Sequence, residues 1–371
     1  MNKTALMLIG TSASCPDIEY LAGFRAVDPV LLCRRHGTIH LVVPEMEAGR
    51  AERSGNGIEV LTPRRLRQGG RRARGAAGWA VALARKLELT AVRVPSGFPH
   101  GVARALTRSG VRVIVLRGDA CPERAVKTAA EWRHIRDAQQ AAVIAMRAAV
   151  AAVAETGIGR DGRLNRGGET LTAGALRALI NRTLLEHHCI CTATIVAGGV
   201  QGADPHEIGA GPLRAHEPIV IDIFPQHQVH GYCGDLTRTI VRGRAPDTVR
   251  RMYAAVRAAQ NAALDRLRAG ASGDAVHRAA ADTFVKRRFD GSGRGRNRAR
   301  FIHGTGHGVG LAVHESPRVS PGGGVLEAGN VVTIEPGLYD REIGGVRLED
   351  TVLVTDSGWK PSVPCEKRLE V

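Results

Sequence analysis

The chain has 371 residues, with 43% hydrophobic residues, 4% aromatic residues and a formal net charge of +16. This length is typical of two domains with sizeable cores. No apolar run reaches the roughly 18–20 residues that a membrane span needs, and the short apolar stretch near the start favours a β-strand over a secretory signal. The seven cysteines are scattered and odd in number, which argues against a disulfide framework and fits a reducing cytoplasm.

Arginine supplies most of the positive charge, because only six of the 52 basic residues are lysine. Arginines concentrate in segments 63–75 and 286–300. One interpretation is a surface for nucleic acid or acidic substrates. The other is a genome that favours arginine, with both segments solvated. Phe289 is the single aromatic residue in these segments that could stack on bases, so we favour the second interpretation and expect no nucleic-acid partner.

The first part of the chain alternates strand-like and helix-like segments, which predicts an α/β layer with a mixed or parallel sheet. It offers no cluster of catalytic groups. A break at 118–123 leads us to place one domain at 1–121 and a second at 122–371. The expected strands are 5–10, 30–43, 91–95 and 111–118, and the expected helices are 45–55 and 78–89.

The second part begins with an alanine-rich segment that predicts a long helix, with Pro122 in its first turn and Gly157 at its end. Thr170 or Thr172 is expected to cap the next helix. Pro246 is expected in the first turn of the third. Strands and glycine-rich turns follow from residue 301. The helices predicted here are 123–156, 171–188, 246–270 and 272–289, and the fold class is α/β (α+β).

The last 150 residues contain a set of two Asp, two Glu and one His in apolar or glycine-rich surroundings. One imidazole and several carboxylates can hold two divalent cations about 3.5–4 Å apart with a water between them, a cage that suits hydrolysis. The pattern therefore predicts metal-assisted hydrolysis. The predicted metal ligands are Asp222, Asp235, His307, Glu335 and Glu349.

Each of these residues also has a structural interpretation. Asp222 interrupts an apolar run, which is costly unless the carboxylate is bound to a metal or paired, so it could instead form a buried ion pair or cap a turn. A strand, a turn and a returning strand would bring Asp235 beside it. Glu335 and Glu349 follow apolar strands and could be solvated strand ends. The joint occurrence of all five residues favours the metal site.

Four segments carry a family resemblance: IDIFPQHQVHGYCGDLTRTIV, HGTGHGVGLAVHESP, TIEPGLY and GGVRLEDTVLVT. In this order they resemble the pita-bread-fold metallopeptidases, in the Xaa-Pro peptidase branch that contains aminopeptidase P and prolidase. The resemblance covers roughly 125–371. The segments DIEYLAGFRAVDPVLL and LVVPEMEAGRA are similar to the creatinase-like domain that precedes the catalytic domain in this family.

The resemblance implies how the ligands divide between two ions. Asp222 would bind one ion through both oxygens, and Asp235 and Glu349 would bridge the two ions. His307 and Glu335 would complete the shell of the second ion. Glu335 would also act on the shared water as base or proton shuttle. Manganese is the expected metal, with cobalt or zinc as alternatives, and the family implies a homodimer.

The resemblance also assigns residues around the metals. His206 matches a substrate-side histidine, His303 the histidine at the mouth of the proline pocket, and His314 the histidine that steadies the scissile carbonyl. Arg347 matches an arginine typical of proline-specific members. The predicted catalytic residues are Glu335, His206, His314 and Arg347, and the predicted substrate-binding residues are His206, His303 and His314.

We therefore predict a dinuclear-metal hydrolase that cleaves between an N-terminal residue and proline through a hydroxide shared by the metals. The substrate would be a dipeptide or longer peptide with proline second, a choice that the sequence leaves open. One alternative is a metal-dependent hydrolase or lyase of the same fold acting on a non-peptide substrate. The other is a non-catalytic protein that binds peptides or nucleic acid.

Overall fold

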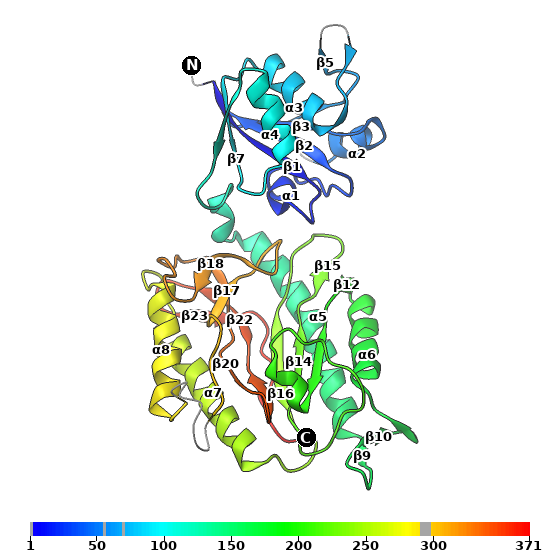
Figure 1. Ribbon diagram of the computed structural model, residues 1–371, viewed down its shortest axis with the longest axis vertical. Helices are drawn as coiled ribbons and strands as arrows, with labels where there is room; N and C mark the ends of the chain where they lie inside the picture. The colour runs from blue at the N-terminus through cyan, green and yellow to red at the C-terminus, as the bar shows by residue number, and fades with distance from the viewer. Residues whose placement is uncertain (1–2, 55–56, 69–70, 290–297) are drawn as a thin grey trace. The chain divides into compact units, whose positions relative to one another are not determined.

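The computed structural model describes residues 3–371 apart from 55–56, 69–70 and 290–297 (Figure 1). By its internal contacts the chain divides into two compact units, Met1–Arg124 and Ala125–Val371. No helix among the described residues is both long and apolar enough to span a membrane.

The first unit is built on a mixed six-stranded sheet, as the alternating pattern predicts. The strand order is β4-β3-β2-β1-β7-β8, in which β1, β2 and β3 are antiparallel neighbours and the remaining pairs are parallel. The strands are β1 (Thr4–Gly10), β2 (Val30–Arg35), β3 (Thr38–Val42), β4 (Ile58–Leu61), β7 (Ala91–Val94) and β8 (Arg112–Val115); the short pair β5 (Arg67–Gln68) and β6 (Arg71–Arg72) lies apart.

The expected single strand over 30–43 is wrong, because it is a hairpin. His36 and Gly37 both have positive φ, 49° and 84°, which turns the chain back tightly between β2 and β3. Helices cover both faces of the sheet, where two separate apolar cores form. The helices are α1 (Pro16–Ala22), η1 (Glu45–Glu47), α2 (Ala48–Glu52), α3 (Gly75–Lys86) and α4 (His100–Arg108).

The second unit contains two helix pairs with strands between them (Figure 1). The first pair packs on a three-stranded antiparallel sheet, β13-β14-β16, around one apolar core. Its main elements are α5 (Ala129–Ala154), α6 (Ala173–Glu186), β13 (Ile195–Gly198), β14 (Ile219–Ile223) and β16 (Leu236–Ile240). Short elements join them: η2 (Pro122–Ala125), which begins in the first unit, β9 (Gly157–Ile158), β10 (Leu164–Arg166), β11 (Glu169–Thr170), β12 (Cys189–Ile190), η3 (Gly199–Ala203) and β15 (Gln226–His227).

The second helix pair packs on the remaining strands around another core. A five-stranded sheet runs β18-β17-β19-β22-β23, and β20 and β21 form a separate hairpin. The strands and glycine-rich turns predicted after residue 301 are found in this half of the unit. Its elements are α7 (Asp247–Arg266), α8 (Gly273–Lys286), β17 (Gly306–Gly308), β18 (Glu315–Val319), β19 (Val331–Ile334), β20 (Gly337–Asp340), β21 (Gly344–Arg347), β22 (Asp350–Val354) and β23 (Trp359–Pro361).

The four predicted helices of this unit all form, with shorter bounds. The predicted start of the first at residue 123 is wrong: Pro122 opens the 3-10 turn η2, and α5 begins only after Thr128. The Thr128 side chain accepts from the Glu131 backbone N–H, and the Glu131 carboxylate accepts from the Thr128 N–H, which is a capping box. Thr172, not Thr170, caps α6, and Pro246 immediately precedes α7.

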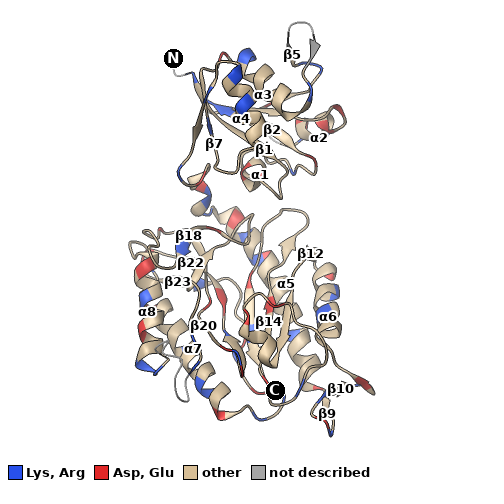
Figure 2. Cartoon of the chain, in the orientation of Figure 1, with Lys and Arg blue, Asp and Glu red and all other residues tan. Residues whose placement is uncertain are grey.

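Lysine and arginine recur along both units and are interspersed with Asp and Glu (Figure 2). At the end of the second arginine-rich segment, Arg298 donates to Glu342 and lies 3.4 Å from Asp340. The middle of that segment, 290–297, lies outside the described residues.

Replacing Thr128 by Ala should destabilise the second unit by about 1 kcal/mol, because the cap of the longest helix loses its acceptor. Thermal unfolding of Thr128→Ala against the wild type measures the loss. Thr128→Ser keeps a hydroxyl at the cap and serves as the control. Equal unfolding temperatures for Thr128→Ala and the wild type would contradict a stabilising capping box.

Candidate metal centre

The first two predicted ligands meet across β14 and β16. Asp222 lies on β14, directly opposite Thr237 in the antiparallel register, and Asp235 immediately precedes β16. Both carboxylates are buried, with Asp222 9% and Asp235 4% exposed. The strand, turn and returning strand predicted between these two residues are therefore confirmed.

Helix α5 fixes the backbone of Asp235. The Gln139 side chain is fully buried, and its amide accepts from the Asp235 N–H at 2.8 Å and donates to the Asp235 carbonyl at 2.9 Å. The Thr351 hydroxyl donates to the same carbonyl at 2.9 Å. Gly234 permits this approach, because a Cβ there would lie 2.7 Å from the Gln139 nitrogen. Asp235 thus enters the site from a fixed backbone.

The other half of the unit supplies the remaining ligands. His307 lies on β17, Glu335 directly follows β19, and Glu349 lies between β21 and β22. The His307 Nε2 atom is 3.2 Å from Glu335 Oε1 and 3.7 Å from Asp235 Oδ2. A Cβ on Gly306 would overlap the carbonyl oxygen of Thr333, so only glycine lets β17 approach β19 here.

Three of the five predicted ligands meet the geometric requirement of one ion. Among the described residues, Asp235, His307 and Glu349 offer ligand atoms that all lie within 4.8 Å of one another. Asp222 and Glu335 stand beside this trio on the same cavity. The cavity has a volume of about 730 Å³, which lies in the range of ligand pockets.

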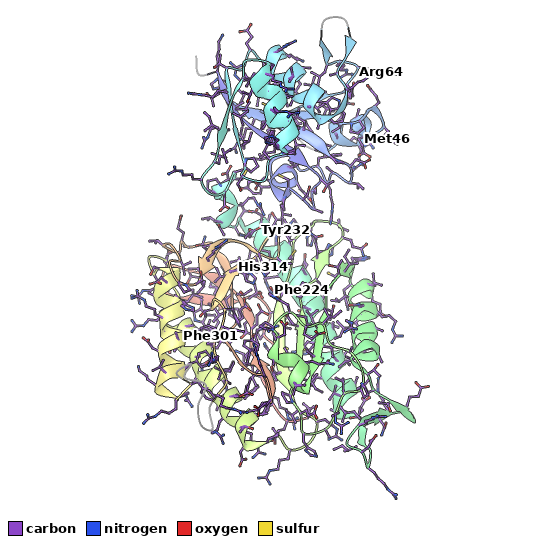
Figure 3. All side chains as sticks on the ribbon, viewed as in Figure 1. Met46, Arg64, Phe224, Tyr232, Phe301 and His314 are labelled. Atoms are coloured by element: carbon purple, nitrogen blue, oxygen red, sulfur yellow. The ribbon has the colours of Figure 1, made fainter. Side chains whose placement is uncertain are left out.

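All nine residues predicted to form the site line this one cavity. Phe224, on the loop after β14, also lines the cavity, and Figure 3 labels it together with His314. Apolar side chains such as Ile195 and Val313 complete the lining. The nine are His206, Asp222, Asp235, His303, His307, His314, Glu335, Arg347 and Glu349.

Arg347 is the main cation within the cavity wall. Its guanidinium is 3% exposed and donates to Asp222 Oδ2 at 2.6 Å, while Asp222 Oδ1 is buried without a hydrogen-bond partner among the described residues. The Thr237 hydroxyl donates to Glu349 Oε2 at 2.7 Å. One oxygen of Asp222 therefore remains available for another ligand.

The carboxylates crowd one another. Burial and the neighbouring Glu349 raise the pKa of Asp235 well above its ordinary value, and burial and Glu335 do the same to the pKa of Glu349. Burial also raises the pKa of Glu335, but the hydrogen bond and charge of His307 outweigh it and bring the pKa to about 2. Burial lowers the pKa of His307, and Glu335 reverses the shift into a net rise.

This charge balance tests whether the residues fit a metal. Among the described residues, four carboxylates share this space with the buried Arg347 and with His307, whose pKa is raised, while the pKa of His303 is lowered, so positive charge is deficient. The unpartnered Asp222 oxygen and the raised pKa values of Asp235 and Glu349 both indicate that deficit. Divalent cations prefer carboxylate oxygen with some imidazole. The residues fit such ions.

A hydrogen-bonded chain connects Arg347 to the predicted proline pocket. Arg347 donates to the Tyr339 hydroxyl at 3.0 Å, and that hydroxyl lies 2.8 Å from His303 Nε2. The other ring nitrogen, Nδ1, is 2.6 Å from the Gly304 carbonyl, which can only accept. His303 Nδ1 therefore carries the proton and Nε2 accepts from Tyr339. Burial lowers the pKa of His303, consistent with this neutral ring.

Two predicted histidines lie at the open side of the cavity. His206 is exposed on the loop after η3, and its N–H donates to Asp204 Oδ1 at 2.9 Å. Gly209, with φ of 80°, brings this loop against β13, where a Cβ would overlap the Val196 carbonyl. His314 packs edge-on against His307 at 4.2 Å between ring centroids. Burial and the neighbouring His307 lower the pKa of His314.

Five residues that support the site were not predicted: Gln139, Thr237, Thr333, Tyr339 and Thr351. Gln139 appears in the sequence as one polar residue within an alanine-rich helix, which carries no signal. Tyr339 and Thr237 lie inside the family-like segments but received no role. Thr333 accepts from the His307 N–H at 3.1 Å. Threonine at alternate strand positions beside carboxylates is the signal that could have identified Thr237 and Thr333.

The fold and the cavity define an α/β protein with a carboxylate-rich site that fits divalent metal ions. The chain belongs to metallopeptidase family M24, whose model matches residues 133–356. This assignment confirms the predicted family resemblance.

Two curated relatives illustrate the similarity in sequence. A Xaa-Pro dipeptidase of Pyrococcus furiosus is 37% identical over 178 residues, which are 47% of this chain and 48% of that protein. An uncharacterized peptidase, YqhT, of Bacillus subtilis is 36% identical over 177 residues, 47% of each protein. The chain thus matches about half the length of these relatives.

Solved structures match almost the whole chain. The prolidase of Pyrococcus horikoshii has a TM-score of 0.81 at 25% identity and covers 99% of this chain and 95% of its own. An X-Pro aminopeptidase of Thermotoga maritima has a TM-score of 0.78 at 22% identity, covering 99% and 97%. These matches confirm the predicted fold class, a creatinase-like α/β domain followed by a pita-bread domain.

Replacing Asp235 by Asn should stabilise the metal-free protein, because one of the crowded buried carboxylates is removed. A carboxyl whose folded pKa is raised loses stabilisation as pH rises through that pKa, so the gain should grow toward alkaline pH. Unfolding temperatures in a chelator measure the effect. Manganese should raise the unfolding temperature of the wild type and leave Asp235→Asn nearly unchanged.

The control for this variant is Asp265→Asn, on the exposed end of α7. It should respond to chelator and manganese as the wild type does. A manganese-induced rise in Asp235→Asn equal to that of the wild type would show that Asp235 is no ligand.

Replacing Gln139 by Leu should cost about 1–3 kcal/mol, because the buried Asp235 N–H loses its acceptor. It should also weaken metal binding, since Asp235 loses its support. Denaturant unfolding and manganese titration measure the two effects. The adjacent Gln140→Leu, on the exposed side of α5, should change neither. Unchanged metal affinity in Gln139→Leu would separate the helix contact from the site.

Proposed function

We propose that this protein is an Xaa-Pro peptidase, a hydrolase that cleaves the bond between an N-terminal residue and proline with the help of two divalent metal ions. The observation that carries the proposal is the single cavity that gathers the carboxylates, His307 and three further histidines. Family membership and the Xaa-Pro peptidases among its relatives support it. A cytoplasmic location and a homodimer stay predictions.

Five residues would hold the ions: Asp222, Asp235, His307, Glu335 and Glu349. Mn²⁺ is the ion we propose first, because oxygen donors outnumber nitrogen. When bound, a pair of such ions lowers the pKa of a shared water toward neutrality and so supplies a hydroxide nucleophile. The remaining chemistry comes from the side chains around them.

Proton transfer falls to Glu335. The neighbouring His307 lowers the pKa of Glu335, so the carboxylate is ionised and could accept a proton from the attacking water. It could then deliver that proton to the proline nitrogen as the bond breaks. His307 and the Thr333 hydroxyl, which is 3.4 Å from Glu335 Oε1, orient the carboxylate.

The exposed histidines would handle the substrate. His314, on the open side of the cavity, would donate to the carbonyl oxygen as it gains charge. His206 faces the same space from the loop after η3. Hydrogen bonds with the Tyr339 hydroxyl and the Gly304 carbonyl hold the ring of His303 in place. Apolar neighbours such as Phe224 and Ile208 would contact a non-polar residue or the pyrrolidine ring and set its orientation.

The two alternative functions have less support. A hydrolase or lyase acting on a non-peptide substrate would use the same ligands, so the ligands alone do not separate the two. The neutral, apolar-flanked ring of His303 suits an imide better than a charged small molecule. A non-catalytic binding protein would not need ionised Glu335 beside the metal ligands.

The central test is cleavage of Ala-Pro and of Ala-Pro-Ala by protein loaded with Mn²⁺. Hydrolysis that disappears in a chelator and returns with Mn²⁺ is expected. His314→Ala should lower kcat by about 10²–10³, on the scale of one lost oxyanion donor, with KM little changed. His187→Ala, exposed at the end of α6, is the matched control. Metal-loaded protein that cleaves neither substrate would refute the proposal.

A further inference from the structure

A second cavity of about 990 Å³ adjoins the metal centre. The two cavities share Pro205 and Ile302 in their walls. Pro205 precedes His206, and Ile302 precedes His303, so the shared wall lies beside two of the histidines proposed to contact substrate. None of the functions proposed above uses this second space.

Strand β20 forms a wall common to both regions. The Tyr339 hydroxyl contacts His303 and Arg347, yet Tyr339 also lines the second cavity. Arg300 pairs with Tyr339 through two backbone hydrogen bonds of 2.9 and 3.0 Å. Directly opposed residues of an antiparallel pair project to the same face, and Arg300 also lines the second cavity. Tyr339 is therefore the residue that separates Arg300 from His303, which is proposed to lie at the mouth of the proline pocket.

Some of the charged side chains that line this cavity have ion-pair or hydrogen-bond partners, and others do not. Arg298 is paired with Glu342 and Asp340. On the loop after η3, Asp204 and Glu207 accept from the N–H groups of His206 and Gly209.

Two arginines remain. Arg300 and Arg341 are exposed in the cavity wall and form no ion pair or side-chain hydrogen bond with any residue that the structure describes. Arginine presents a planar set of donors that matches a carboxylate. Beside them, Val200 and Ile302 are 58% and 57% exposed, so the same wall offers apolar surface for a peptide chain.

We propose that the second cavity binds the part of a peptide substrate that follows proline, and that Arg300 and Arg341 select a carboxylate there. The proposal rests on the Xaa-Pro peptidase function and extends it. The substrate is then a peptide of three residues or more, with an acidic side chain or a free C-terminus at the position after proline.

The test compares two peptides that differ in one charge, Ala-Pro-Glu-amide and Ala-Pro-Gln-amide. The wild type should cleave the Glu peptide with kcat/KM about fivefold to tenfold higher, as expected for a charge-assisted contact that remains partly solvated. The double variant Arg300→Gln/Arg341→Gln should lose this preference and cleave Ala-Pro as the wild type does. Arg266→Gln, on the exposed end of α7, removes a charge elsewhere and should keep the preference.

Equal rates for the two peptides in the wild type, or an unchanged preference in the double variant, would overturn the proposal. So would cleavage of Ala-Pro without cleavage of either longer peptide, and in that case the Xaa-Pro function would stand. If no Xaa-Pro substrate is cleaved, calorimetric binding of Pro-Glu-amide and Pro-Gln-amide still tests the cavity. Tighter binding of the Glu form that the double variant loses would support it, and equal binding would refute it.

Discussion

The constraint on which this molecule depends is the repulsion among four buried carboxylates. Asp222, Asp235, Glu335 and Glu349 meet in one cavity, where Arg347 contacts Asp222 and His307 lies near Asp235 and Glu335. Polar groups in such a place are tolerated when they are paired or when they bind cations. Two direct contacts offset part of this repulsion, one between Arg347 and Asp222 and one between His307 and Glu335. The pKa values of Asp235 and Glu349 remain raised, so part of the negative charge of the metal-free site is not compensated.

Backbone geometry makes this crowding possible. The antiparallel register of β14 and β16 brings the two aspartates together, and Gly306 lets the His307 strand lie against β19. Both halves of the second unit carry their own apolar core, which stabilises the strands independently of the charges they present. Free energy from apolar burial thereby offsets the cost of assembling like charges. Replacing a glycine such as Gly306 by a larger residue would push the strand of His307 away from β19 and so displace this ligand, although the ligand itself is unchanged.

The sequence alone was sufficient to predict the strongly patterned helices and the predicted site residues, but not every helix end, turn or supporting contact. Strongly patterned segments such as α7, and nine of the residues that line the cavity, were predictable because short motifs carry them. The start of α5 was not, because a local capping box at Thr128 and Glu131 outweighed the helical pattern upstream. The hairpin between β2 and β3 depends on the positive φ of His36, which is uncommon for a residue other than glycine. Gln139 could not be found, because its role exists only across 96 positions of chain.

The hydrogen-bonded chain from Asp222 through Arg347 and Tyr339 to His303 links the charge of the candidate metal centre to the residue proposed at the mouth of the proline pocket. Arg347 donates to both Asp222 and the Tyr339 hydroxyl, and the backbone of Tyr339 pairs with that of Arg300. A cation bound at Asp222 would compete with Arg347 for the carboxylate. Under the proposed function, the position of His303 would therefore depend on whether the metals are present, and the ions that activate water would also complete the pocket for proline.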